Sequence, residues 1–207
     1  MSGKSKMLWV LVAAVGVVLS GPLMSRVEQA KYTLVKTEGN IEIRDYAANI
    51  VAETRVQGER GEAMVDGFKR IADYIFGNNV SNVTAHAAQQ KSQRIAMTAP
   101  VIQKTIDDSD NSWAVRFVMP AEYTLETLPK PKNADVYIKA IPETRFAVIQ
   151  FSGVGSDERL KKETELLRAY MTANHLQEIS SPNYAFYNPP WTLPAWRRNE
   201  VMIQVEQ

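Results

Sequence analysis

Two stretches of the chain decide the fold because they repeat one another: IEIRDYAANIVAETRVQG at residues 41–58 and VYIKAIPETRFAVIQFSG at residues 136–153. A shift of 95 residues, without a gap, aligns their apolar positions and places Gly58 on Gly153. Both stretches alternate as strands do, and both end in glycine before a helical pattern begins. The sequence therefore predicts a unit that occurs twice.

A helix is predicted after each repeated stretch, at residues 61–76 and 157–174. The second helix has Ser156 or Asp157 at its N-cap. The first carries an apolar stripe at helical spacing, made of Met64, Phe68, Ile71, Ala72 and Ile75. Further strands are predicted at residues 32–37, 94–105, 112–119, 184–187 and 200–205.

Each half thus contains two strands, a helix and two more strands, over about residues 41–119 and 136–205. A doubly wound parallel fold would need a helix between nearly every pair of strands. The sequence therefore predicts an α+β protein with pseudo-twofold symmetry. We expect one curved antiparallel sheet, or distorted barrel, with two long helices packed against it.

The first 30 residues differ from the rest. Lys4 and Lys6 precede an apolar run, in the order of an export signal. The run from Met7 to Met24 has 18 residues, the lower limit for a membrane-spanning helix. An uncleaved anchor, a cleaved signal and a buried core helix remain open. We predict a signal or membrane anchor with a short linker at residues 1–30, and one domain at residues 31–207.

This N-terminal segment predicts a cell-envelope location. Positive charge before an uncleaved anchor keeps the N-terminus in the cytoplasm, so the domain would lie outside the cytoplasm at the inner membrane. A cleaved signal would instead give a periplasmic or secreted protein. In the anchored case the membrane is a partner through this segment alone.

Charge and composition exclude several functions. The 24 basic and 23 acidic residues nearly balance, which argues against nucleic-acid binding. The chain has no cysteine, so disulfides, thiolate nucleophiles and Fe–S clusters are excluded. No phosphate-binding loop, nucleophile elbow or HExxH helix occurs. We therefore expect a binding protein rather than an enzyme.

A few residues could bind a ligand. His86 lies in a polar stretch, where it is either a solvated loop residue or a ligand to a metal or haem iron. His175 lies at the end of the second helix, where a cation suits the helix dipole. The stripe of the first helix is either core or one wall of a ligand slot. Pro100 cannot donate to a strand ladder, which predicts a bend or an edge beside a cleft.

The stretch YNPPWTLPAWRRNEV at residues 187–201 allows two interpretations. In the first, proline turns hold wide aromatic faces while Arg197 and Arg198 bind carboxylates such as haem propionates. In the second, Trp191 and Trp196 form a structural lid and the arginines pair with neighbouring acids such as Glu200.

Several motifs occur in a fixed order along residues 32–205. They are YTLVKTEGNIEIRDY, YIFGNN, IAMTAPV, VRFVMP, LPKP, FSG and NPPWTLPAWRRNEV. Together they resemble the SOUL haem-binding protein family. The resemblance implies a barrel-like α+β fold built from two similar halves, a fold also similar to the effector-binding domains of certain bacterial regulators.

The resemblance also implies a function. Members bind haem or metal-free porphyrin non-covalently in a shallow apolar cleft beside the first helix, with no universal axial ligand. Lys69 and Arg70 lie off the apolar stripe, unlike the basic residues that animal members place near the porphyrin acids. We expect a carrier, buffer or scavenger; the alternative is a module that binds another amphipathic small molecule or a protein. By position, the cleft face consists of Met64, Phe68, Ile71, Ala72 and Ile75, with Met97 nearby.

Overall fold

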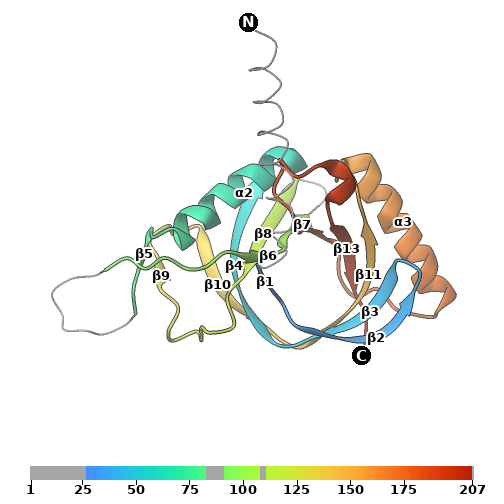
Figure 1. The fold of residues 1–207 in the computed structure, drawn as a ribbon, viewed down its shortest axis with the longest axis horizontal. Coiled ribbons are helices and arrows are strands. Elements are labelled where there is room, and N and C mark those ends of the chain that lie inside the picture. The colour runs from blue at the N-terminus through green and yellow to red at the C-terminus, as the bar shows by residue number, and fades with distance from the viewer. Residues whose placement is uncertain (1–26, 83–90, 108–110, 207) are drawn as a thin grey trace, which may run out of the picture.

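The computed structural model describes residues 27–82, 91–107 and 111–206. Nine of its strands form one antiparallel sheet, in the order β10-β4-β8-β7-β12-β13-β11-β3-β2. The sheet curls into a half-barrel, and α2 (Arg60–Ile75) and α3 (Asp157–Ala173) lie on its outer side (Figure 1). The predicted α+β class, curved sheet and two long helices are confirmed.

The two halves repeat the same order of elements. The first half contains β3 (Ile41–Tyr46), β4 (Asn49–Gln57), α2, β7 (Val101–Asp107) and β8 (Ser112–Val118). The second contains β10 (Val136–Ile141), β11 (Thr144–Phe151), α3, β12 (Asn183–Phe186) and β13 (Asn199–Gln204). The 95-residue shift between the repeated stretches therefore places β3 on β10 and β4 on β11.

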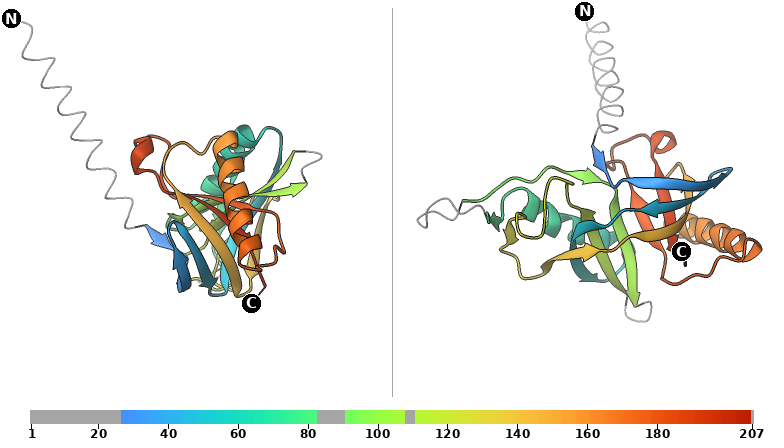
Figure 2. Two further views of the ribbon diagram at one scale, coloured as in Figure 1. Left: turned by 90° about the vertical axis from the view of Figure 1, so that its right-hand side faces the viewer. Right: turned by 90° about the horizontal axis from the view of Figure 1, so that it is seen from below.

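The halves exchange their first strands. Strand β3 pairs with β11 of the second half, and β10 pairs with β4 of the first half. Strands β7 and β12 pair at the centre of the sheet. The two helices consequently flank the central strands at opposite ends of the molecule (Figure 2). Strand β2 (Tyr32–Glu38) extends one edge beyond β3.

Shorter elements complete the fold. Strand β1 (Glu28–Gln29) pairs in parallel with β6 (Thr98–Ala99), and Ala30 packs against the apolar cluster on the inner side of the half-barrel. The N-terminal end of the described chain therefore crosses the open side of the curl. The remaining elements are β5 (Asn79–Val80), β9 (Lys130–Pro131) and the short 3₁₀ helix η1 (Pro194–Trp196).

Helix α2 approaches the sheet closely because one of its inner residues is a glycine. A Cβ atom on Gly67 would lie 2.4 Å from Cγ2 of Val115 on β8. The close approach lets Ile71, Tyr74 and Ile75 become almost completely buried against the sheet. This side of the half-barrel therefore has a packed apolar core.

Helix α3 has defined signals at both ends. At its start, the backbone N–H of Arg159 donates to Oγ of Ser156, 3.3 Å away, as predicted for the cap. At its end, the N–H of Leu176 donates to the carbonyl of Met171 and that of His175 to Thr172. His175 has a φ of 56°, so the helix ends in a Schellman motif with a histidine where glycine is usual.

This backbone conformation supports a stability prediction. His175→Gly should raise the free energy of unfolding by about 1 kcal/mol, because glycine adopts the left-handed region without a Cβ clash. Ala173→Gly, inside the helix, should lower it by a similar amount. Urea denaturation of both variants checks this; a loss of stability in His175→Gly would contradict the assigned backbone strain.

The predicted signal or membrane anchor lies almost wholly in residues 1–26, outside the described residues. Within residues 27–82, 91–107 and 111–206, no helix has the length and apolar character needed to cross a bilayer.

Candidate functional site

The predicted cleft face on α2 divides into two groups. Ile71, Ala72 and Ile75 are buried, and Ile71 and Ile75 belong to the core under the helix, so these three side chains do not form its outer surface. Met64 is only partly buried, and Phe68 is 37% exposed. The stripe is therefore core over most of its length and reaches the surface only at Met64 and Phe68.

The exposed part forms what we call the α2 edge: Met64, Val65 and Phe68. Phe68 is one helical turn from each of the other two, and its ring lies 5.5 Å from that of Phe117 on β8. Val65 is 51% exposed, more than any member of the predicted stripe. Met97 packs against the same core as Met64 and Phe117. Sequence reasoning missed Val65 because it lies beside the stripe and not on it.

The basic residues of α2 already have partners. Nζ of Lys69 lies 3.7 Å from a carboxylate oxygen of Asp66. Nη1 of Arg70 donates to the carbonyl of Arg55 at 3.2 Å and lies 3.6 Å from Asp135. Both cations therefore make local contacts, although Lys69 is one helical turn from Val65 of the α2 edge.

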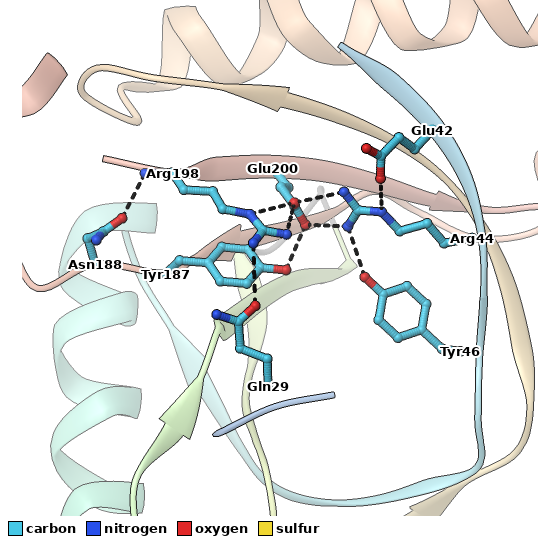
Figure 3. Close-up of polar contacts among 8 residues, drawn as sticks. All are labelled: Gln29, Glu42, Arg44, Tyr46, Tyr187, Asn188, Arg198 and Glu200. Atoms are coloured by element: carbon cyan, nitrogen blue, oxygen red, sulfur yellow. Dashed lines mark hydrogen bonds and ion pairs between the residues drawn. The ribbon is translucent and has the colours of Figure 1, made fainter. Parts of the chain in front are cut away.

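A second candidate region lies on the inner side of the half-barrel, around Glu200 (Figure 3). Its side chain is fully buried and accepts hydrogen bonds from two guanidinium groups. Nη1 and Nη2 of Arg44 donate at 3.0 and 3.1 Å, and Nε and Nη2 of Arg198 donate at 2.9 and 2.7 Å. The hydroxyl of Tyr187 donates to the same carboxylate at 2.7 Å. Glu200 thus joins β3, β13 and the segment after β12.

The charges in this Glu200 cluster are matched. Arg44 also donates from Nε to Glu42 at 2.6 Å, so two carboxylates face Arg44 and Arg198. Burial alone would lower the pKa of the Arg44 guanidinium, but Glu200 outweighs burial and raises it. Burial and the charge of Glu200 raise the pKa of Tyr46 to about 12. Arg44 therefore stays charged and Tyr46 stays neutral across the physiological pH range.

Arg197 and Arg198 occupy structural positions. The guanidinium of Arg198 stacks on the Tyr187 ring at 3.9 Å, in addition to its bonds with Glu200. Arg197 donates to the carbonyls of Thr192 and Pro190. The pairing of Arg198 with Glu200 matches the second interpretation of this segment, whereas binding of propionates would require both arginines to exchange these contacts.

The tryptophans of the same segment face solvent. Trp191 is 68% exposed and Trp196 is 54% exposed, so neither ring is buried against the sheet as a lid would require. That part of the second interpretation is wrong. The proline-rich segment holds its shape through the contacts of Arg197 with its own backbone.

A third group of charges lies across the inner face from Glu200. Glu53 on β4 is buried and pairs with Lys139 and with Nε of Arg116 at 2.6 Å. Burial alone would raise the pKa of the Glu53 carboxyl, but the two cations outweigh burial and lower it. Burial and the nearby Arg116 lower the pKa of Lys104 on β7. Two cations therefore pair with one carboxylate while Lys104 lies close to Arg116, and we call these four residues the Glu53 cluster.

A cavity on the inner face is lined by Arg116 of the Glu53 cluster and by Tyr187 beside Glu200. Arg116, Tyr187 and Pro100 contribute to its wall, so the predicted bend at Pro100 does lie beside a cavity. Its apolar lining includes Val51, Ile102, Val118, Ile141, Phe146 and Met202. A second hollow adjoins it at one end of the half-barrel and shares Gln29, Ala30, Asn49, Val118 and Ile141 with it.

The sequence matches the family model described as SOUL heme-binding protein over residues 27–204. The match covers most of the chain. The chain belongs to the SOUL heme-binding protein family. No curated protein matches this SOUL chain in a sequence search.

Solved structures share the fold of this SOUL domain at low sequence identity. The EcmrR C-terminal domain has a TM-score of 0.61 at 12% identity, with 85% of this chain and 98% of that chain covered. A hydrolase from Listeria innocua has a TM-score of 0.59 at 13% identity, with coverages of 83% and 94%. These similarities establish the fold alone.

Within the described residues, no histidine lies at the α2 edge of this SOUL protein. His86 lies within residues 83–90, outside the described residues, so its role as an iron ligand stays a prediction. His175 lies beyond the end of α3. Among the residues that the structure describes, no group of three His, Cys, Asp or Glu side chains is placed to hold a metal ion.

Proposed function

We propose that this SOUL protein binds haem or a related tetrapyrrole non-covalently at the α2 edge, as a non-catalytic carrier, buffer or scavenger in the cell envelope. The observation that carries the proposal is the exposure of Phe68 and Val65 beside Met64, on a helix whose other apolar side chains are mostly buried. An exposed apolar edge fits one face of a flat macrocycle. Family membership supports the class of ligand.

The energy of such contact is sufficient without an iron ligand. Burying one face of a porphyrin, on the order of several hundred Å² at about 25 cal/mol per Å², supplies several kcal/mol before ordering costs. Metal-free protoporphyrin should therefore bind about as well as haemin. A Kd above about 10 μM for both ligands, near −7 kcal/mol, would reject the proposal. The measurement is a Soret and fluorescence titration of the full-length protein.

Phe68→Ser should weaken protoporphyrin binding about tenfold, because it removes the largest exposed apolar contact of the α2 edge. The matched control is Leu166→Ser on α3, which removes a side chain of similar exposure. Leu166→Ser should leave the Kd unchanged. Equal weakening in both variants would show that the porphyrin does not bind at this edge.

The role of His86 and the location need separate tests. If His86 is an iron ligand, His86→Ala will shift the Soret band and weaken haemin binding while protoporphyrin binding stays the same. An unchanged spectrum excludes that role.

The envelope location, with the N-terminal segment as signal or anchor, is tested by fractionation of cells that express the full chain. Recovery in the cytoplasmic fraction would contradict it.

A second candidate is the binding of another amphipathic small molecule, or of a protein, without haem. The contacts of Lys69 and Arg70 favour it, because both cations already pair with protein groups and are not free to meet porphyrin carboxylates. Mass spectrometry of molecules that co-purify with the native protein separates the candidates. A non-porphyrin amphipath that is lost in Phe68→Ser supports this alternative, and a tetrapyrrole supports the first proposal.

A further inference from the structure

The Glu53 cluster carries more positive than negative charge inside the half-barrel. Arg116 and Lys139 pair with the single carboxylate of Glu53, and Lys104 lies near Arg116, so the formal charges of the cluster sum to two positive charges. The carboxylates further round the curl are already used, because Glu200 and Glu42 pair with Arg44 and Arg198. Partly buried cations are costly without a partner, so an anion is the expected occupant.

The hydrogen-bonding groups of this region are adjacent on the central strands. Arg116 lies opposite Ile102, and Lys104 lies opposite Asn183. Arg116 uses Nε for Glu53, and within the described residues its two Nη atoms have no other hydrogen bond. The amide oxygen of Asn183, a residue that is 6% exposed, also has no partner among these residues. The amide lies in the cavity wall, and rotating it would present its NH₂ group instead.

An apolar path leads from these cations to the mouth. Along β8, Arg116 is followed on the inner face by Val118, which lines both hollows. Val51 lies opposite Val118 on β4. Beyond them the second hollow is lined by apolar side chains that include Ile50, Ala140, Pro120, Tyr123 and Leu125. The cavity therefore has the cation of Arg116 in its wall and a mostly apolar exit with charged residues such as Glu28 and Lys31 at its rim.

We infer that the half-barrel cavity is a second ligand site, separate from the α2 edge, for a slender amphipathic carboxylate such as a long-chain fatty acid. Arg116 and Asn183, which line the cavity, bind the carboxylate, and Lys104, which lies opposite Asn183 on β7, adds its positive charge. The acyl chain lies along Val118 and Val51 and leaves through the mouth. This inference does not depend on tetrapyrrole binding, because the two sites lie on opposite faces of the sheet.

The experiment titrates the full-length protein with oleate and, as an uncharged probe of the same length, oleyl alcohol. Oleate should bind saturably and more tightly than the alcohol. Lys104→Met should weaken oleate binding at least about tenfold, the loss expected for one hydrogen bond to a charged group, and leave alcohol binding unchanged. Lys161→Met on the exposed face of α3 is the control, with an unchanged Kd for both probes.

Lys104→Met should fold normally, since Lys104 forms no ion pair within the described residues; a urea denaturation curve checks this. Arg116→Met is the second variant and should weaken oleate binding by at least the same factor. The inference is overturned if oleate does not bind saturably, or if Lys104→Met and Arg116→Met bind it as the unchanged protein does. If protoporphyrin competes with oleate, and Lys104→Met weakens the binding of both ligands equally, the two ligands share one site and the proposed separation is wrong.

Discussion

Glu200→Ala should lower the free energy of unfolding by about 3–5 kcal/mol, the range for breaking a buried ion pair by removing one partner. The variant leaves the buried guanidinium of Arg44, whose side chain is 1% exposed, without its main counter-charge. It also removes the acceptor for Arg198 and for the Tyr187 hydroxyl. Since a domain of this size has a total stability of about 5–15 kcal/mol, the loss is large. Urea denaturation followed by circular dichroism measures it.

The matched control is Glu178→Ala. Glu178 also accepts two hydrogen bonds from one arginine, Arg168, at 2.8 and 2.9 Å, but both side chains are partly exposed. Exposed pairs contribute little, so we expect a loss below about 1 kcal/mol. Similar losses in the two variants would mean that burial of the Glu200 cluster does not determine its contribution.

Gly67→Ala should destabilise the protein by about 3 kcal/mol, although alanine is the better helix former. The new Cβ would lie 2.4 Å from Cγ2 and 2.6 Å from Cβ of Val115. The second of these atoms is attached directly to the backbone of β8, so a side-chain rotation cannot relieve the clash. Helix α2 must therefore move away from the sheet. Thermal and urea denaturation measure the loss.

Two further variants isolate the cause. Gly61→Ala lies in the first turn of the same helix, where a Cβ would meet nothing within 4 Å, and should stabilise the protein by about 0.5–1 kcal/mol. Adding Val115→Ala to Gly67→Ala should recover part of the loss, because it removes the clashing methyl groups. If the double variant loses more free energy of unfolding than the two single variants lose together, close packing at Gly67 is not the cause of the destabilisation.

The order of elements could be predicted because local patterns determine it. The repeated stretches alternate with a period of two, and the stripes after them have helical spacing, so strands and helices follow directly. The exchange of β3 and β10 between the halves could not be predicted, because no local pattern specifies which distant strand is the neighbour. The predicted extended segment at residues 94–105 joins strands only from Thr98 onward.

The main feature of the candidate site that the sequence did not predict is the group of charged residues on the inner face of the sheet. Glu42 and Arg44 alternate with apolar residues, which is also the pattern of a strand with one face in solvent. Curling of the sheet encloses that face and buries Arg44 and Glu53. Curvature arises from the whole sheet, so single strands do not reveal it. The one available signal was Glu53 following the apolar run Ile50-Val51-Ala52.

The exchange of first strands has a consequence for the repeated unit itself. A half made alone would keep β4, α2, β7 and β8, but the edge of β4 that β10 covers would be open, and β3 would lack β11. Open strand edges recruit other chains. Such a half could complete its sheet only by joining a second copy in a strand-swapped homodimer. The full chain can be regarded as that dimer, joined by the segment between β8 and β10 into a single polypeptide.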